Sequence, residues 1–160
     1  MAIPKPATAT APAPAKLMIT AVKSTPLLED GVHDVRIVSA KLIDAPNANF
    51  VDKTPQLEIV YANAEDRKVT KWYNLKGYAA NPDGSVKIDE NTGERIESPE
   101  NTEACMRILG NVALAAGAEE GQQVSINDLV NAEVRITVQR KNSTSGKLVP
   151  EVISVQAIEA

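Results

Sequence analysis

The alternation of hydrophobic and polar residues predicts five β-strands. Apolar, largely β-branched residues recur along the chain at the two-residue period of a half-buried strand. In the first stretch the apolar positions change phase, since Val35 and Ile37 lie on one face and Val38 and Leu42 on the other. Such a phase change predicts a bulge or a strong bend. The strand-like stretches are Gly31–Ala45, Gln56–Asn63, Lys68–Leu75, Val134–Val138 and Leu148–Ile158.

One main helix is predicted to begin at Ser98. Its hydroxyl suits the capping position, Pro99 suits the first helical position and Glu100 is an acid in the first turn. Gly117 suits the C-terminal end of this helix, and a shorter second helix is expected at Ser125–Val130. The apolar residues at helical spacing are Cys105, Ile108, Leu109, Val112 and Ala116.

The predicted order is three strands, one main helix and two strands. Turn signals between Gly77 and Ser98 predict an inserted hairpin before the helix. This order, after a long bent first strand, is typical of a five-stranded Greek-key barrel of the OB type. We therefore expect an all-β OB-fold barrel with one main helix over residues 26–160. A disordered Pro/Ala/Thr-rich tail is expected over residues 1–25.

The composition argues against several functional classes. The 160-residue chain has one cysteine, Cys105, and one histidine, His33, so metal sites and nucleophilic relays built on these residues are poorly supplied. It has no phosphate-binding glycine loop, no apolar run long enough for a membrane span and no signal-peptide core. We expect a cytoplasmic protein that is not an enzyme and needs neither a cofactor nor a metal.

The third predicted strand combines positive charge with the only tryptophan, although the net charge of the chain is -4. Its alternation places Val69, Tyr73 and Leu75 on a core face, with Lys71 among them. A large ring on the polar face together with lysines is the combination that binds single-stranded nucleic acid, because bases stack on rings and phosphates attract cations. We call that polar face the Trp72 face; its residues are Lys68, Thr70, Trp72, Asn74 and Lys76.

Further candidates lie around this strand. Phe50 and Lys53 are in the loop after the first strand, and Tyr78 follows the third strand. Tyr61 and Tyr73 share a phase with apolar neighbours and are expected in the core. An alternative for Trp72 is packing under the inserted hairpin, with lysines that are only solvated. The predicted DNA-binding residues are Trp72, Lys68, Lys71, Asn74, Lys76, Tyr78, Phe50, Lys53, Arg135, Gln139, Lys141 and Lys147.

Five segments resemble a known class of phage-encoded proteins, namely small families assigned as OB-fold single-stranded-DNA-binding proteins. The similar segments are "GVHDVRIVSAKLIDA", "TPQLEIVYAN", "VTKWYNLKGY", "MRILGNVALAAGAEEG" and "DLVNAEVRITVQRK", and the similarity covers roughly Gly31 to Ile158. Asn131 stands where these families commonly have glycine. The acidic C-terminal tip of bacterial single-strand-binding proteins is not evident in "VQAIEA".

The resemblance implies a non-catalytic coat on single-stranded DNA during phage replication or recombination, in the cytoplasm of a bacterial host. Binding would be largely independent of sequence. The partners expected are single-stranded DNA, with RNA, a second copy of the chain, and replication or recombination proteins left open. The alternative is a virion structural protein or a protein-interaction module built on a small β-barrel.

Overall fold

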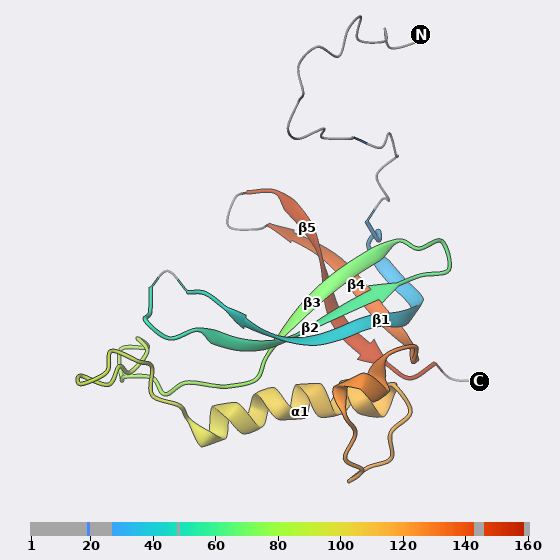
Figure 1. Ribbon diagram of the computed structural model, residues 1–160. Helices are drawn as coiled ribbons and strands as arrows, with labels where there is room; N and C mark the ends of the chain where they lie inside the picture. The colour runs from blue at the N-terminus through green and yellow to red at the C-terminus, as the bar shows by residue number, and fades with distance from the viewer. Residues whose placement is uncertain (1–18, 20–26, 48, 143–145, 159–160) are drawn as a thin grey trace, which may run out of the picture.

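The protein folds as one antiparallel sheet with a helix packed beneath it, as Figure 1 shows for the computed structural model. The structure describes residues 19, 27–47, 49–142 and 146–158, so the tail predicted for residues 1–25 lies outside the described residues apart from Ile19. The elements are β1 (Gly31–Ala45), β2 (Thr54–Ala62), β3 (Lys68–Asn74), α1 (Pro99–Ala115), the 3-10 turn η1 (Ile126–Leu129), β4 (Glu133–Asn142) and β5 (Leu148–Gln156).

The sheet has the order β3-β2-β1-β4-β5, with β1 in the centre. β1 pairs with β4 through its first half and with β2 through its second half, and the register shifts between Ile37 and Ser39. This shift is the bulge that the phase change in the sequence predicts. An extra residue lets the strand bend while Val35 and Ile37 stay buried. The prediction of five strands and one main helix in this order is confirmed.

The sheet is not closed by a fifth ladder. Among the described residues no backbone hydrogen bond joins the edge strands β3 and β5. The two edges meet through side chains instead, because Lys71 Nζ of β3 lies 3.3 Å from Glu151 Oε1 of β5. Below this ion pair, α1 lies against both strands around a groove of about 420 Å³ lined by Tyr73, Val112 and Val152, among others. A mostly antiparallel sheet with one helix is thus established.

The core lies between the concave face of the sheet and the C-terminal half of α1. Tyr61 and Tyr73 are buried as predicted, and their hydroxyl oxygens are 2.7 Å apart in a shared hydrogen bond. Burial raises the pKa of the Tyr61 hydroxyl and also that of the Tyr73 hydroxyl. The largest fully buried side chains are Tyr61, Leu28, Ile37, Ile59, Ile136, Val112, Val134 and Val138.

The helix starts as its sequence predicts but packs less deeply than predicted. Ser98 Oγ accepts a hydrogen bond from the Asn101 N–H at 3.2 Å, and Gly117 after its end has φ 108°. The stripe of apolar residues is only partly buried, because Val112 and Ala115 are the buried residues of α1, whereas Leu109, Ala113 and Ala116 pack against the core while partly exposed. Ile108 is 56% exposed and Cys105 is only half-buried. The second helix expected at Ser125–Val130 is a single 3-10 turn.

Two short segments, residues 27–30 before β1 and Asn131 before β4, are held to the sheet by hydrogen bonds to its backbone groups. Leu28 is fully buried, and its N–H points to the Lys68 carbonyl at 3.5 Å. Asp30 accepts the Arg140 backbone N–H at 2.8 Å, so residues 27–30 tie β3 to β4. Asn131 has φ 74° and donates its N–H to the Ile37 carbonyl at 2.7 Å. Glycine and asparagine are the residues that adopt this left-handed conformation most readily.

Candidate nucleic-acid interface

The Trp72 face has the alternation that the sequence predicts. Val69 and Tyr73 are buried, whereas Lys68 and Asn74 are exposed on the opposite face. The Trp72 side chain is 51% exposed in the middle of this strand. Packing of Trp72 beneath the insert is therefore not observed. A half-exposed tryptophan on a sheet face is unusual, because large rings are mostly buried.

Hydrogen bonds to β2 hold the polar side chains of this face. Trp72 Nε1 donates to Glu58 Oε2 at 2.9 Å, and Glu58 also pairs with Lys41 of β1 at 3.4 Å. Gln56 Nε2 donates to Asn74 Oδ1 at 2.9 Å. These cross-strand contacts satisfy the indole N–H and limit rotation of the ring. Trp72 is thus an oriented ring with half of its surface open to a ligand.

The basic residues of the Trp72 face have acidic neighbours. Lys68 Nζ lies 4.0 Å from Asp66 Oδ1, and Lys76 Nζ lies 4.0 Å from Glu97 Oε2. Exposed ion pairs of this length contribute little to stability and are screened by salt. A phosphate can therefore replace the carboxylate at modest cost. Lys53 makes no ion pair with any described residue.

Lys71 lies apart from the other lysines of β3. Its side chain is on the core face, where Nζ is 5.9 Å from the centroid of the Tyr73 ring and 3.3 Å from Glu151. Glu151 also pairs with Lys141 at 2.7 Å. Hydrogen bonds from Lys141 first, and then from Lys71, lower the pKa of Glu151. Lys71 and Lys141 thus share the carboxylate of Glu151 on β5, and the Lys71 side chain extends from the face of β3 opposite to the Trp72 face.

The candidates on β4 are also separated from Trp72, because β2 and β1 lie between β3 and β4 in the sheet. Arg135 makes a two-pronged contact with Asp34 of β1, at 2.7 and 3.2 Å. This hydrogen bond is the main reason why the pKa of Asp34 is lowered. Gln139 is exposed further along β4. Lys147 is exposed beside residues 143–145, which lie outside the described part of the chain.

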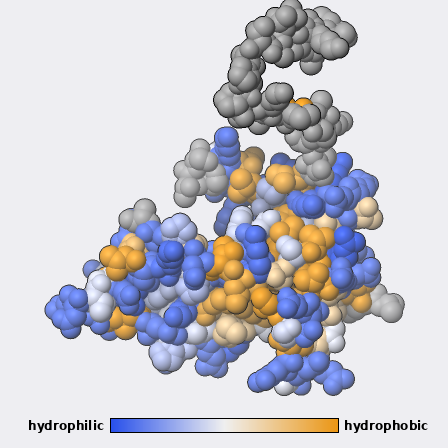
Figure 2. Space-filling model, in the orientation of Figure 1, coloured by the Kyte–Doolittle hydropathy of each residue, from blue (hydrophilic) through white to orange (hydrophobic). Residues whose placement is uncertain are grey.

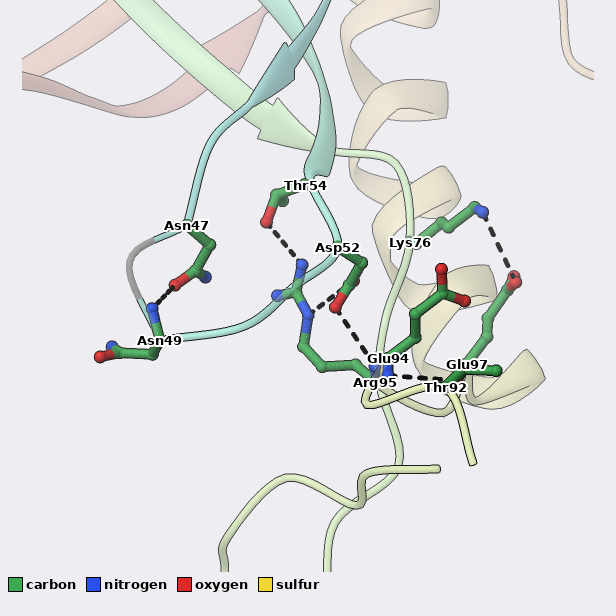
Figure 3. A network of polar contacts seen from close by, with 9 residues as sticks. All are labelled: Asn47, Asn49, Asp52, Thr54, Lys76, Thr92, Glu94, Arg95 and Glu97. Atoms are coloured by element: carbon green, nitrogen blue, oxygen red, sulfur yellow. Dashed lines mark hydrogen bonds and ion pairs between the residues drawn. The ribbon is translucent and has the colours of Figure 1, made fainter. Parts of the chain in front are cut away.

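Phe50 and Tyr78 lie in a separate group that the sequence did not reveal. The guanidinium of Arg95 lies 4.0 Å from the centroid of the Tyr78 ring and 4.8 Å from that of Phe50. Arg95 Nε donates to Asp52 Oδ2 at 2.9 Å and Nη2 donates to Thr54 Oγ1 at 2.8 Å (Figure 3). We call these five residues the Arg95 cluster. It fastens the insert, residues 77–98, to the loop between β1 and β2.

The electrostatics of the Arg95 cluster fit a structural role. Burial acts to raise the pKa of Asp52 and is the largest single influence, but hydrogen bonds from the Arg95 backbone and side chain outweigh it. The pKa of Asp52 is therefore lowered. Burial also raises the pKa of the Tyr78 hydroxyl. Arg95 is the only arginine in the acidic insert. This is the one feature of the sequence that could have indicated its structural role.

The insert itself is mostly polar. Figure 2 shows hydrophilic side chains over its end of the molecule and hydrophobic ones nearer the junction of the sheet with α1. Isolated bridges join Tyr78 to Glu97, Ala80 to Val86 and Ile88 to Arg95, in agreement with the hairpin-like insert expected. Gly77 begins it and donates its N–H to Thr102 Oγ1 at 3.0 Å. A side chain at Gly77 would overlap Asn101 of α1.

Comparison with known proteins does not assign a family. No protein-family model matches the chain, and no curated protein is significantly similar to it. None of the helices that the structure describes has the length and apolar character needed to cross a membrane. Within the described residues there is also no group of three or more histidine, cysteine or acidic side chains that could hold a metal ion.

Proposed function

We propose that the protein is a non-catalytic single-stranded-DNA-binding protein with a barrel of the OB type. The observation that carries the proposal is the half-exposed, oriented ring of Trp72 on a sheet face with exposed lysines. Stacking contributes about 1–3 kcal/mol per base and tolerates every base, which suits a coat on single strands. The order of the strands and the approach of β3 to β5 support the OB assignment.

The proposed binding surface is smaller than the set of candidate residues. Its centre consists of Trp72, Asn74, Lys68 and Lys76, which share one face of the strand and the residues that follow it. Lys53 and the Arg95 cluster lie at the insert end, where the cluster fixes Phe50 and Tyr78 rather than freeing them to stack. We infer that a strand is bound mainly across β3 and β2. The resemblance to phage proteins supports a role in replication or recombination in a bacterial cytoplasm.

A fluorescence titration tests this function, since Trp72 is the only tryptophan. The full chain is titrated with oligo-dT at low and at high salt, and with a duplex of equal length. We expect strong quenching by the single strand, weaker quenching by the duplex and loss of affinity at high salt through counterion release. An unchanged spectrum at low salt with oligo-dT would refute the proposal.

A protein-interaction module is the second candidate, and a specific surface favours it. Met106 and Ile108 of α1 and Ile153 of β5 are each more than half exposed, and the last two line the groove between α1, β3 and β5. Clustered exposed apolar side chains commonly mark interfaces. If Ile153→Asp, which alters the groove but not the Trp72 face, abolishes binding of a partner or self-association and retains oligo-dT binding, this surface has an additional function.

A further inference from the structure

A small pocket at the open edge of β3 lies directly beside Trp72. It has a volume of about 210 Å³ and lies between β3 and the middle of α1. We call it the edge pocket; it is lined by Lys71, Trp72, Tyr73, Asn74, Cys105 and Ile108.

Backbone groups of β3 point toward this edge. The Leu75 N–H donates to the Pro55 carbonyl at 3.1 Å, so Leu75 faces β2. Backbone groups alternate sides along an antiparallel strand, so the N–H and C=O of Trp72 and Asn74 face away from β2. The Lys68 carbonyl, which has the same phase, receives the Leu28 N–H from that outer side. Within the described residues, no backbone hydrogen bond is made by the outward groups of Trp72 and Asn74.

The side chain of Asn74 adds directed donors. Its Oδ1 accepts Gln56 Nε2 at 2.9 Å, so the amide orientation is fixed and its Nδ2 hydrogens remain available. Within the described residues these hydrogens are donated to no hydrogen-bond acceptor. The pocket thus combines apolar walls from Tyr73 and Ile108 with a polar edge made of the N–H and C=O groups of Trp72 and Asn74, to which the Asn74 amide adds two further N–H donors. Such a lining suits a flat ligand with apolar faces and a carbonyl on its rim.

We propose that the edge pocket takes one carbonyl-bearing base of the bound strand, stacked beside Trp72 and hydrogen-bonded by Asn74 and the β3 backbone edge. This inference rests on the proposed function and extends it. A purely stacking surface is indifferent to the base. A pocket that hydrogen-bonds the edge of a base distinguishes one base from another. Thymine, which carries two carbonyls, is therefore favoured over adenine, which carries none.

The single cysteine provides a direct probe, since Cys105 lines the pocket. The rate of Cys105 alkylation is measured in the full chain alone, with oligo-dT, and with an abasic oligonucleotide of equal length. Trp72 fluorescence is followed in the same samples. We expect oligo-dT to slow alkylation at least tenfold and the abasic strand to leave it nearly unchanged. Because Cys105 is half-buried, Ile108→Cys in a Cys105→Ser background serves as a more exposed reporter.

A matched control places the thiol away from β3. Gln123→Cys in the Cys105→Ser background has an exposed position after α1, and its alkylation should not respond to either strand. If oligo-dT quenches Trp72 but protects neither reporter, the pocket assignment is wrong and the proposed function stands. Equal protection by the abasic strand would show that the backbone, not a base, crosses the pocket. If oligo-dT neither quenches Trp72 nor slows alkylation, both proposals are overturned.

Substitution of Asn74 tests the selectivity. We expect Asn74→Ala to weaken oligo-dT binding about five- to tenfold while oligo-dA binding changes less than twofold. Asn91→Ala, in the exposed insert, is the control and should change neither. An equal loss for both oligonucleotides would assign Asn74 a general role in the surface and contradict base selection by the pocket.

Discussion

The Trp72 face and the Arg95 cluster use the same kinds of side chain for different ends. Each brings aromatic rings and cations together. On the Trp72 face the ring is half exposed and hydrogen-bonded at its edge to Glu58. In the Arg95 cluster two rings pack against one guanidinium, and the Arg95 side chain is only 7% exposed. Rings and cations therefore indicate a ligand site only where their faces remain open.

Removal of the exposed Trp72 ring is the strongest test of this difference between the two regions. Trp72→Ala should weaken oligo-dT binding by about 1–3 kcal/mol, or roughly 5- to 150-fold, because one stacked base is lost. Its thermal unfolding should change little, since the ring is half exposed. Affinity is measured by anisotropy of a labelled oligonucleotide, because the variant has no tryptophan. Trp72→Phe keeps a ring and should lose less; equal affinity in all three proteins would remove Trp72 from the site.

A substitution in the Arg95 cluster should lower the stability of the fold more than the affinity for DNA. Arg95→Ala is expected to lower the free energy of unfolding by about 2 kcal/mol, since cation-π contacts that are shielded from water are lost together with hydrogen bonds. Oligo-dT binding should weaken less than in Trp72→Ala. Denaturant unfolding measures the change. Arg107→Ala is the matched control because its ion pair with Glu103 is exposed on α1, and it should cost less than about 0.5 kcal/mol.

Charge on the Trp72 face can be separated from stacking. Lys68→Gln with Lys76→Gln should reduce the slope of log affinity against log salt by about 1.4, at about 0.7 per phosphate contact on a single strand. Quenching at saturation should remain. The control, Lys87→Gln with Arg107→Gln, removes the same charge from the insert and from α1. A slope that falls equally in both double variants would show that net charge, not this face, attracts DNA.

The smallest effect expected is a pH dependence of the stability that Asp52 contributes through the Arg95 cluster. Because the folded pKa of Asp52 is lowered, its contribution is present above the ordinary value of 3.8 and is lost as the pH falls through the folded value. The difference in melting temperature between the wild type and Asp52→Asn should therefore shrink in acid. Thr54→Val is the control, since it removes another hydrogen bond of Arg95 and changes no titratable group, and its difference should stay constant.

The strands could be predicted from the sequence because burial on one face imposes a two-residue period. The phase change at Ile37 predicted the bulge, and the alternation around Tyr73 predicted which side of β3 is buried. The capping signals at Ser98 and Gly117 predicted the limits of α1. These features are local, so a single sequence carries them. The depth of α1 in the core depends on the separation of β3 and β5, which no local pattern encodes.

The candidate site was less predictable because its contacts join distant segments. Arg95 reaches Asp52 across 43 positions of sequence, and no spacing rule links them. The sequence therefore predicts Phe50 and Tyr78 as binding residues, whereas in the structure both rings pack against the Arg95 guanidinium. The charge of Lys71 predicts a contact with DNA, whereas its phase in the strand predicts the core face, which is where its side chain lies. The acids beside Lys68 and Lys76 lie in the β2–β3 connection and at the end of the insert, and the sequence does not fix the direction of either segment.

The double role of β1 has a consequence for synthesis of the chain. Its second half finds β2 as soon as residue 62 has been made, but its first half pairs with β4, where Gly31 meets Val138. At translation rates of about 5–20 residues per second, that edge waits on the order of 5 to 20 seconds without a partner. An unpaired strand edge invites association with other chains. The nascent protein is thus most exposed to misassembly before β4 emerges from the ribosome.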